Sequence, residues 1–217
     1  MTQTAPAPLS SPFIYLASKS PRRQELLRQI GIDFRLLLPQ DHEDAEALEA
    51  TRIGEAPASY VKRVVLAKLE AARARLARLA LPEAPVLSAD TTVALGGTLL
   101  GKPADAAQAA SMLSRLSGRT HRVLTAVAVG DTRHTDWVVQ VSRVSFTRLS
   151  AAEIDTYVAS GEPYDKAGGY GIQGAAGAFV RKIEGSHSGI MGLPLHETNR
   201  LVRKALARFG SAYPAGH

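Results

Sequence analysis

The residues from Ser18 to Arg23 combine hydroxyl groups and positive charge where an apolar strand is expected to give way to a helix. A proline fits the first position of a helix, and Ser20 before it is a natural N-cap. Backbone N–H groups at such a helix start favour phosphate, and Arg22 and Arg23 add guanidinium groups beside them. The segment therefore predicts an anion site, with a capped helix bearing two solvated arginines as the alternative.

Asp90 follows a short apolar stretch, Pro85 to Ala89, and is itself followed by Thr91. A carboxylate at the C-terminal end of a strand often faces a cleft, where it can bind a divalent cation or accept a proton from water. A turn aspartate with a capping role is the alternative.

Two lysines stand where they could meet an anion. Lys68 lies three residues after Val65 and four before Ala72, which places it on the apolar face of a predicted helix. It either extends its ammonium to solvent or contacts an anion. Lys102 precedes Pro103, which fixes the backbone after a predicted hairpin. A solvated hairpin lysine is the alternative there, and the pattern is not a Walker loop.

A glycine-rich segment, residues 164–174, carries Asp165, Lys166 and Gln173. Glycines allow a backbone to approach a ligand closely, and a glutamine amide offers the donor and acceptor that a nucleobase edge or a ribose requires. A flexible loop is the alternative. Glu43, in an acidic stretch, is a candidate second metal carboxylate or part of a solvated run of charge.

The elements that must position these residues alternate between strand and helix patterns. Strands are predicted at 13–17, 34–38, 85–89, 92–95, 98–100, 121–129, 137–146 and 179–183, and helices at 21–30, 57–79, 104–116, 151–160 and 194–209. The pattern predicts an α/β fold with a mixed sheet. We expect a single catalytic domain over residues 12–209, a disordered N-terminal extension at 1–11 and a flexible tail at 210–217.

Composition narrows the class of partner. The 217 residues carry a formal net charge of +6 and no cysteine, so a disulfide framework and thiolate metal sites are excluded. No apolar run is long enough for a membrane span, and the N-terminus lacks the pattern of a secretory signal. The basic residues are dispersed rather than interleaved with aromatics, so a cleft for a small polyanion explains the charge more simply than nucleic-acid binding.

Together these segments resemble the Maf family of nucleoside triphosphate pyrophosphatases. The resemblance runs from about Phe13 to Phe209 and rests on Leu16–Arg23, Ser88–Val93, Gly101–Pro103, Ala159–Pro163, Asp165–Gly168, Tyr170–Gly174, Val180–Ile183 and Gly192–Leu195. It implies an elongated mixed sheet with flanking helices and two lobes around a cleft, as in inosine-triphosphatase-like proteins. The variant of the motifs looks like the branch that hydrolyses dTTP and UTP, with modified pyrimidine nucleotides as further substrates.

The resemblance also implies roles for individual residues. Asp90 matches the proton acceptor and a metal carboxylate, and Glu43 matches a second carboxylate near Mg²⁺ or Mn²⁺. The triphosphate would be held by Lys68, Lys102 and Arg23, and base selection would fall to Arg22, Thr91 and Gln173. Ser20, Asp165 and Lys166 complete the implied substrate site.

The implied setting is a cytoplasmic homodimer that acts on nucleoside triphosphates and binds neither nucleic acid nor membrane. Another base preference, or a non-catalytic role in cell division and septum formation, are the alternatives that the sequence leaves open.

Overall fold

The computed structural model describes residues 12–44 and 46–209, so the predicted N-terminal extension 1–11 and tail 210–217 lie outside the described residues. Strands and helices alternate along the chain in the order β1 (Ile14–Leu16), α1 (Pro21–Gln29), β2 (Phe34–Leu36), η1 (Ala47–Glu49), α2 (Pro57–Arg78), β3 (Val86–Leu95), β4 (Thr98–Leu100), α3 (Ala106–Leu116), β5 (Thr120–Gly130), β6 (Thr135–Phe146), α4 (Ala151–Ala159), η2 (Glu162–Asp165), η3 (Ala167–Gly169), η4 (Ala175–Phe179), β7 (Val180–Glu184), α5 (His187–Ile190) and α6 (Leu195–Arg208).

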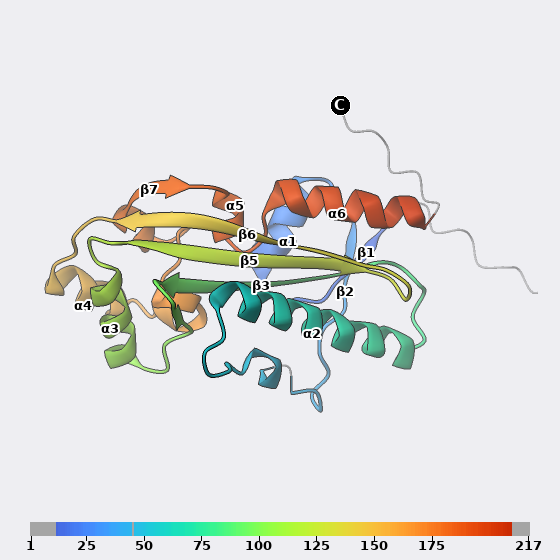
Figure 1. Ribbon diagram of the computed structural model, residues 1–217, viewed down its shortest axis with the longest axis horizontal. Helices are drawn as coiled ribbons and strands as arrows, with labels where there is room; N and C mark the ends of the chain where they lie inside the picture. Colours follow the sequence, from blue (N-terminus) through green and yellow to red (C-terminus); the bar gives the residue numbers. More distant parts are fainter. Residues whose placement is uncertain (1–11, 45, 210–217) are drawn as a thin grey trace, which may run out of the picture.

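One seven-stranded mixed sheet organises these elements, in the order β2-β1-β3-β5-β6-β7 with β4 paired to β3. The strands β1, β2 and β3 run parallel, whereas β5, β6 and β7 add antiparallel neighbours. The long strands β3, β5 and β6 extend along the length of the molecule (Figure 1). The α/β fold with a mixed sheet that the sequence predicts is confirmed.

The edge of β3 opposite β5 is only partly covered. The strand β1 pairs with Val86 and Leu87, and β4 pairs with Val93 to Leu95. On the other edge β5 pairs continuously from Val86 to Ala94. In the described part of the chain, residues 88–92 therefore have a strand on one side only, and this gap is where a ligand can approach the sheet.

Helices cover the sheet differently at its two ends. Around β1 and β2 the sheet lies between α2 on one face and α1 with α6 on the other, and the two apolar cores there are separate. At the far end α3 and α4 pack on β3, β5 and β6 through a third core that includes Tyr170 and Phe179. The β3 gap lies between these two ends (Figure 1).

The prediction that Asp90 ends a strand is wrong. Asp90 lies in the middle of β3, which continues to Leu95, because β5 pairs with every residue from Val86 to Ala94 and carries the strand through the polar positions. The predicted strands at 85–89 and 92–95 are thus one. Alternation along β3 then sends Asp90 and Thr91 to opposite faces of the sheet.

The glycine-rich segment is ordered by short helical turns rather than forming one open loop. Its N–H at Gly168 donates to the Gly101 carbonyl at 2.9 Å, which ties it to the loop that carries Lys102. Gly168 has φ +76°, and an added Cβ would lie 3.0 Å from carbons of Val93. Gly161 has a similar φ of +77° but open space around it.

These two glycines give a matched test of how the segment is held. Gly161→Ala is expected to lower the free energy of unfolding by about 1–2 kcal/mol, the usual strain of a left-handed residue. Gly168→Ala should lower it further, since the methyl group also meets Val93. Urea unfolding of the two variants measures the difference. Equal losses would show that Val93 yields without strain and that the contact does not hold the segment.

Candidate active site

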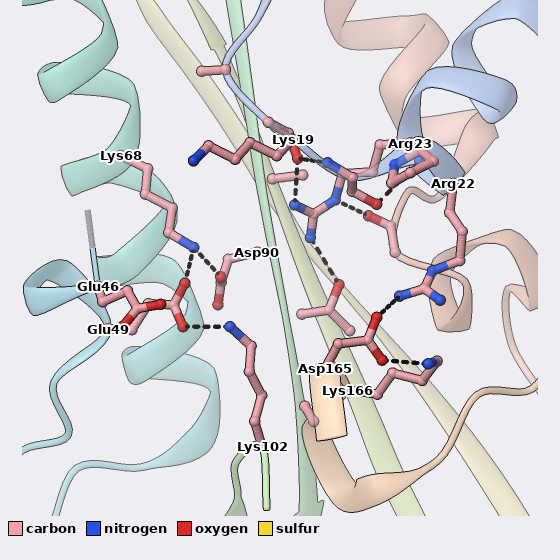
Figure 2. Close-up of a pocket in the computed structure, with 18 of the residues that line it drawn as sticks. Lys19, Arg22, Arg23, Glu46, Glu49, Lys68, Asp90, Lys102, Asp165 and Lys166 are labelled. Carbon is pink, nitrogen blue, oxygen red and sulfur yellow. Dashed lines mark hydrogen bonds and ion pairs between the residues drawn. The ribbon is translucent and has the colours of Figure 1, made fainter. Parts of the chain in front are cut away.

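A cavity of about 980 Å³ lies at the β3 gap and is lined by all the predicted site residues. Its volume suits a small-molecule ligand. Figure 2 shows Lys68, Glu49, Asp90 and Lys102 on one side of the cavity and Arg22, Asp165 and Lys166 on the other, with Arg23 between the groups. Because consecutive residues of β3 face opposite ways, the cavity wraps around the unpaired strand edge.

Lys68 is the centre of the first group. It projects from α2, and its Nζ lies 2.7 Å from Asp90 Oδ1 and 2.7 Å from Glu49 Oε1. Lys102 Nζ lies 3.6 Å from the other oxygen of Glu49. Of the two possibilities for Lys68, contact with an anion is therefore the one observed, although the anions are carboxylates of the protein itself.

The pKa values of the two carboxyl groups of this cluster are shifted in opposite directions. Burial raises the pKa of the Asp90 carboxyl, an effect that the nearby charges of Lys68 and Arg23 oppose without cancelling. A raised pKa makes a carboxylate a better proton acceptor near neutral pH. Burial also acts to raise the pKa of Glu49, but Lys68 and Lys102 outweigh it and hold that pKa below its usual range.

Glu49 is the site residue that the sequence did not reveal. It lies in the acidic stretch after Pro39, where no periodic pattern distinguishes one glutamate from another. The signal for it is indirect: a lysine on an apolar helix face either extends to solvent or meets an anion, and Glu49 is one of the anions that Lys68 meets.

Arg23 is held by the protein on three sides. Its Nε donates to the Gly192 carbonyl at 2.9 Å, Nη1 donates to Ser18 Oγ at 3.1 Å, and Nη2 donates to Thr91 Oγ1 at 3.4 Å. Burial lowers the pKa of this guanidinium, although the charges of Asp90 and Glu49 act against that change. Two of its five N–H groups have no acceptor in these contacts and can meet a ligand.

The hydroxyl group of Thr91 is already committed. Thr125 donates to the Gly189 carbonyl at 2.7 Å, so the proton between Thr91 and Thr125, 2.9 Å apart, must come from Thr91. Thr91 therefore acts on a ligand only as an acceptor or through Arg23, whose position it fixes.

The remaining predicted substrate residues come from α1 and the glycine-rich segment. Ser20 is the N-cap of α1, and its Oγ accepts from the Arg23 N–H at 3.4 Å, as predicted for the cap. Arg22 lies 3.8 Å from Asp165, and Lys166 donates to the Glu162 carbonyl at 2.7 Å and to Asp165. Gln173 is exposed at the cavity wall.

Glu43 has partners other than Asp90. Both its oxygens accept from Arg75, Arg78 donates to it as well, and Arg75 is buried and also donates to the Leu37 carbonyl at 2.9 Å. These arginines lower the pKa of Glu43 to about 2. Glu43 thus fastens the loop after β2 to α2, and the carboxylate that accompanies Asp90 at Lys68 is Glu49.

A divalent cation would find oxygen ligands here rather than a closed cage. Within residues 12–44 and 46–209, no three His, Cys, Asp or Glu side chains are grouped to hold a metal. Asp90 and Glu49 are two carboxylates that face one cavity, and Mg²⁺ typically takes one or two carboxylates together with substrate phosphates and water. The donor set is therefore compatible with a cation that arrives with a polyphosphate.

The fold and the cavity define the class: an α/β protein in which Asp90 of the central sheet meets Glu49 from η1 and lysine and arginine side chains from the surrounding elements at one cavity. The sequence model of the Maf-like protein family matches residues 13–205. The chain therefore belongs to the Maf-like family. None of the described helices combines the length and the apolar character needed to span a membrane.

Three relatives extend this comparison over most of the chain, and each is named dTTP/UTP pyrophosphatase. One from Cupriavidus pinatubonensis is 59% identical over 91% of this chain and 98% of its own length. One from Cupriavidus metallidurans is 58% identical over the same shares, and one from Burkholderia pseudomallei is 57% identical over 92% and 97%.

The role of Glu43 can be tested through stability and pH. Because the pKa of Glu43 falls to about 2 on folding, its contribution to stability is complete above the unfolded value near 4.5 and is lost as pH falls toward 2. Glu43→Gln should therefore lower the melting temperature at pH 7, and the gap from the parent protein should narrow below about pH 4. A gap that is constant with pH would show that the carboxylate charge is not what holds the loop.

Proposed function

We propose that this protein hydrolyses dTTP and UTP to the corresponding monophosphate and pyrophosphate. The relatives that share 57–59% of its sequence carry that activity in their name. The observation that most supports it in this chain is the cluster of Lys68, Asp90, Glu49 and Lys102 beside the unpaired edge of β3. Such a cluster can hold a phosphate chain and activate water in the same cavity.

In the proposed reaction, water attacks the α-phosphorus and a new phosphorus–oxygen bond forms. The bond from that phosphorus to the oxygen bridging to the β-phosphate breaks, and pyrophosphate leaves. Asp90 accepts the proton of the attacking water. Lys68, Lys102 and Arg23 carry the positive charge that stabilises the phosphoryl oxygens in an in-line arrangement.

We assign the metal role to Asp90 and Glu49, which face the same ammonium, in preference to Glu43, whose carboxylate is held by Arg75 and Arg78. A bound Mg²⁺ or Mn²⁺ would add charge neutralisation at the phosphates. The Lys68 ammonium lies 2.7 Å from an oxygen of each carboxylate and offsets part of the repulsion between them.

Base selection is proposed to lie at the other side of the cavity. The uracil and thymine edge presents two carbonyl oxygens and one N–H, and a glutamine amide can pair with one of each. Gln173 is exposed and lines the same cavity as the Arg22–Asp165 pair. We further propose that the protein acts in the cytoplasm and as a homodimer.

The central prediction concerns Asp90→Asn. Loss of the proton acceptor should reduce pyrophosphate release from dTTP and UTP by about 10²- to 10⁴-fold. Asp136→Asn is a matched control, since Asp136 pairs with Lys204 and Arg208 away from the cavity. A coupled pyrophosphate assay with Mg²⁺ and Mn²⁺ makes the measurement, with thermal unfolding to confirm folding.

Two results would contradict the proposal. A folded parent protein that releases no pyrophosphate from any nucleotide would favour the alternative of a non-catalytic regulator. Full turnover by Asp90→Asn would leave the reaction intact but remove Asp90 from it.

A second prediction concerns the base. For the parent protein, kcat/KM for dTTP and UTP should exceed that for CTP and the purine triphosphates. In Gln173→Ala the preference for UTP over CTP should fall by about 10-fold, because a site that hydrogen-bonds its substrate loses discrimination with that bond. An unchanged ratio would place base selection on other residues.

A further inference from the structure

The backbone on either side of Glu49 is held by two side chains of α2. Tyr60 donates its hydroxyl to the Glu49 carbonyl at 2.9 Å. Arg63 donates Nη2 to the Ala50 carbonyl at 2.8 Å and Nη1 to the Leu48 carbonyl at 3.5 Å. Three consecutive carbonyl groups, centred on Glu49, are thus fixed by residues one turn apart on a single helix.

The orientation of the Arg63 guanidinium is fixed by a second partner, Glu55. Glu55, just before α2, accepts from Arg63 Nε and Nη2 at 2.7 Å each, a two-pronged ion pair. Both side chains are largely shielded from solvent, at 22% and 11% exposure. The guanidinium also lies over the Tyr60 ring, 5.5 Å from its centroid. The pair therefore behaves as one rigid unit rather than as two mobile surface groups.

These contacts supply Glu49 with a fixed position that its own short helical turn does not provide. The residue ends a three-residue helical turn, which is too short to fix a side chain by its own hydrogen bonds. Its carboxylate must nevertheless stay beside a second carboxylate, Asp90, at the shared ammonium of Lys68. The helix α2 supplies Lys68, which binds the Glu49 carboxylate, and also Tyr60 and Arg63, which bind the backbone around Glu49. Both parts of Glu49 are therefore positioned by the same helix.

We propose that Tyr60 and Arg63 are positioning residues, which hold the Glu49 carboxylate at Lys68 and Lys102 and so set the geometry of the phosphate site. The importance of this for turnover rests on the proposed function. Neither residue lines the cavity, so neither is expected to touch the substrate.

The hydroxyl of Tyr60 stays protonated throughout the working range of pH. Burial, followed by the negative charges of Asp90 and Glu49, raises the pKa of Tyr60 to about 12. The hydrogen bond to the Glu49 carbonyl is therefore expected to persist at any pH at which the enzyme would be assayed.

A double-mutant cycle tests the proposal. Tyr60→Phe should lower kcat/KM for dTTP about 5- to 10-fold, as expected when one buried hydrogen bond is removed. In a Glu49→Gln background the same change should have less than a 2-fold effect, since the residue it positions is gone. Arg63→Met should follow the same pattern with a larger single effect.

Matched controls separate positioning from simple loss of stability. Tyr15→Phe also removes a buried hydroxyl bound to a carbonyl, that of Pro82 at 3.2 Å, and should leave kcat/KM unchanged. Lys62 precedes Arg63 in the sequence, but its ammonium lies over the Trp137 ring and not at the Glu49 backbone. Lys62→Met should therefore also leave kcat/KM unchanged.

Hydrogen–deuterium exchange gives a readout that needs no turnover. The amides of Glu49 and Ala50 donate to the Glu46 and Ala47 carbonyls, and in Tyr60→Phe their exchange should accelerate severalfold while that of β5 stays the same. Accelerated exchange in a protein that is inactive toward dTTP and UTP would overturn the proposed function and leave the positioning of Glu49 standing. Unchanged exchange, or equal effects of Tyr60→Phe with and without Glu49, would overturn the positioning role.

Discussion

Two carboxylates can occupy one side of this cavity because a lysine lies between them. Asp90 and Glu49 each lie 2.7 Å from Lys68, and without that ammonium their charges would repel across a partly dehydrated space. The rest of the site follows from this requirement. A long helix must bring the lysine to the middle of β3, and a segment remote from both must bring the second carboxylate to the lysine.

The helix α2 carries apolar side chains that pack into the core and charged side chains that reach Asp90 and the acidic stretch. One face packs Val61, Val65 and Leu69 into the apolar core against β3 and β5. From the margin of that face Lys68 reaches Asp90, while Arg75 binds the loop after β2 through Glu43. Among the described residues between Pro39 and Glu55, the regular structure is the short turn η1. Glu43 and Glu49 in this stretch are therefore positioned by side chains of α2, and α2 itself is held by its packing in the core.

The sequence predicted the fold and much of the site because local signals were strong. The proline after Ser20 and the apolar periodicity around Lys68 each specify one element and one orientation. It could not predict that β3 continues past Asp90, since that depends on pairing with β5, which comes later in the chain. Nor could it distinguish Glu49 from Glu43, because both are glutamates in one irregular acidic stretch. Which of them lies beside Lys68 is decided by the contacts that each makes with α2. Their different partners, two lysines for one and two arginines for the other, are a property of the folded chain.

The uncovered stretch of β3 bears on how the sheet limits the addition of a strand from another chain. An exposed strand edge is ordinarily a template on which another chain can add a strand and begin aggregation. Here the open stretch spans only residues 88–92, and β1 and β4 lie at its two ends along the same edge. An incoming extended chain would collide with both before it could form a ladder. The unpaired backbone groups of residues 88–92 can therefore be reached by a compact ligand, whereas an extended polypeptide cannot pair along them.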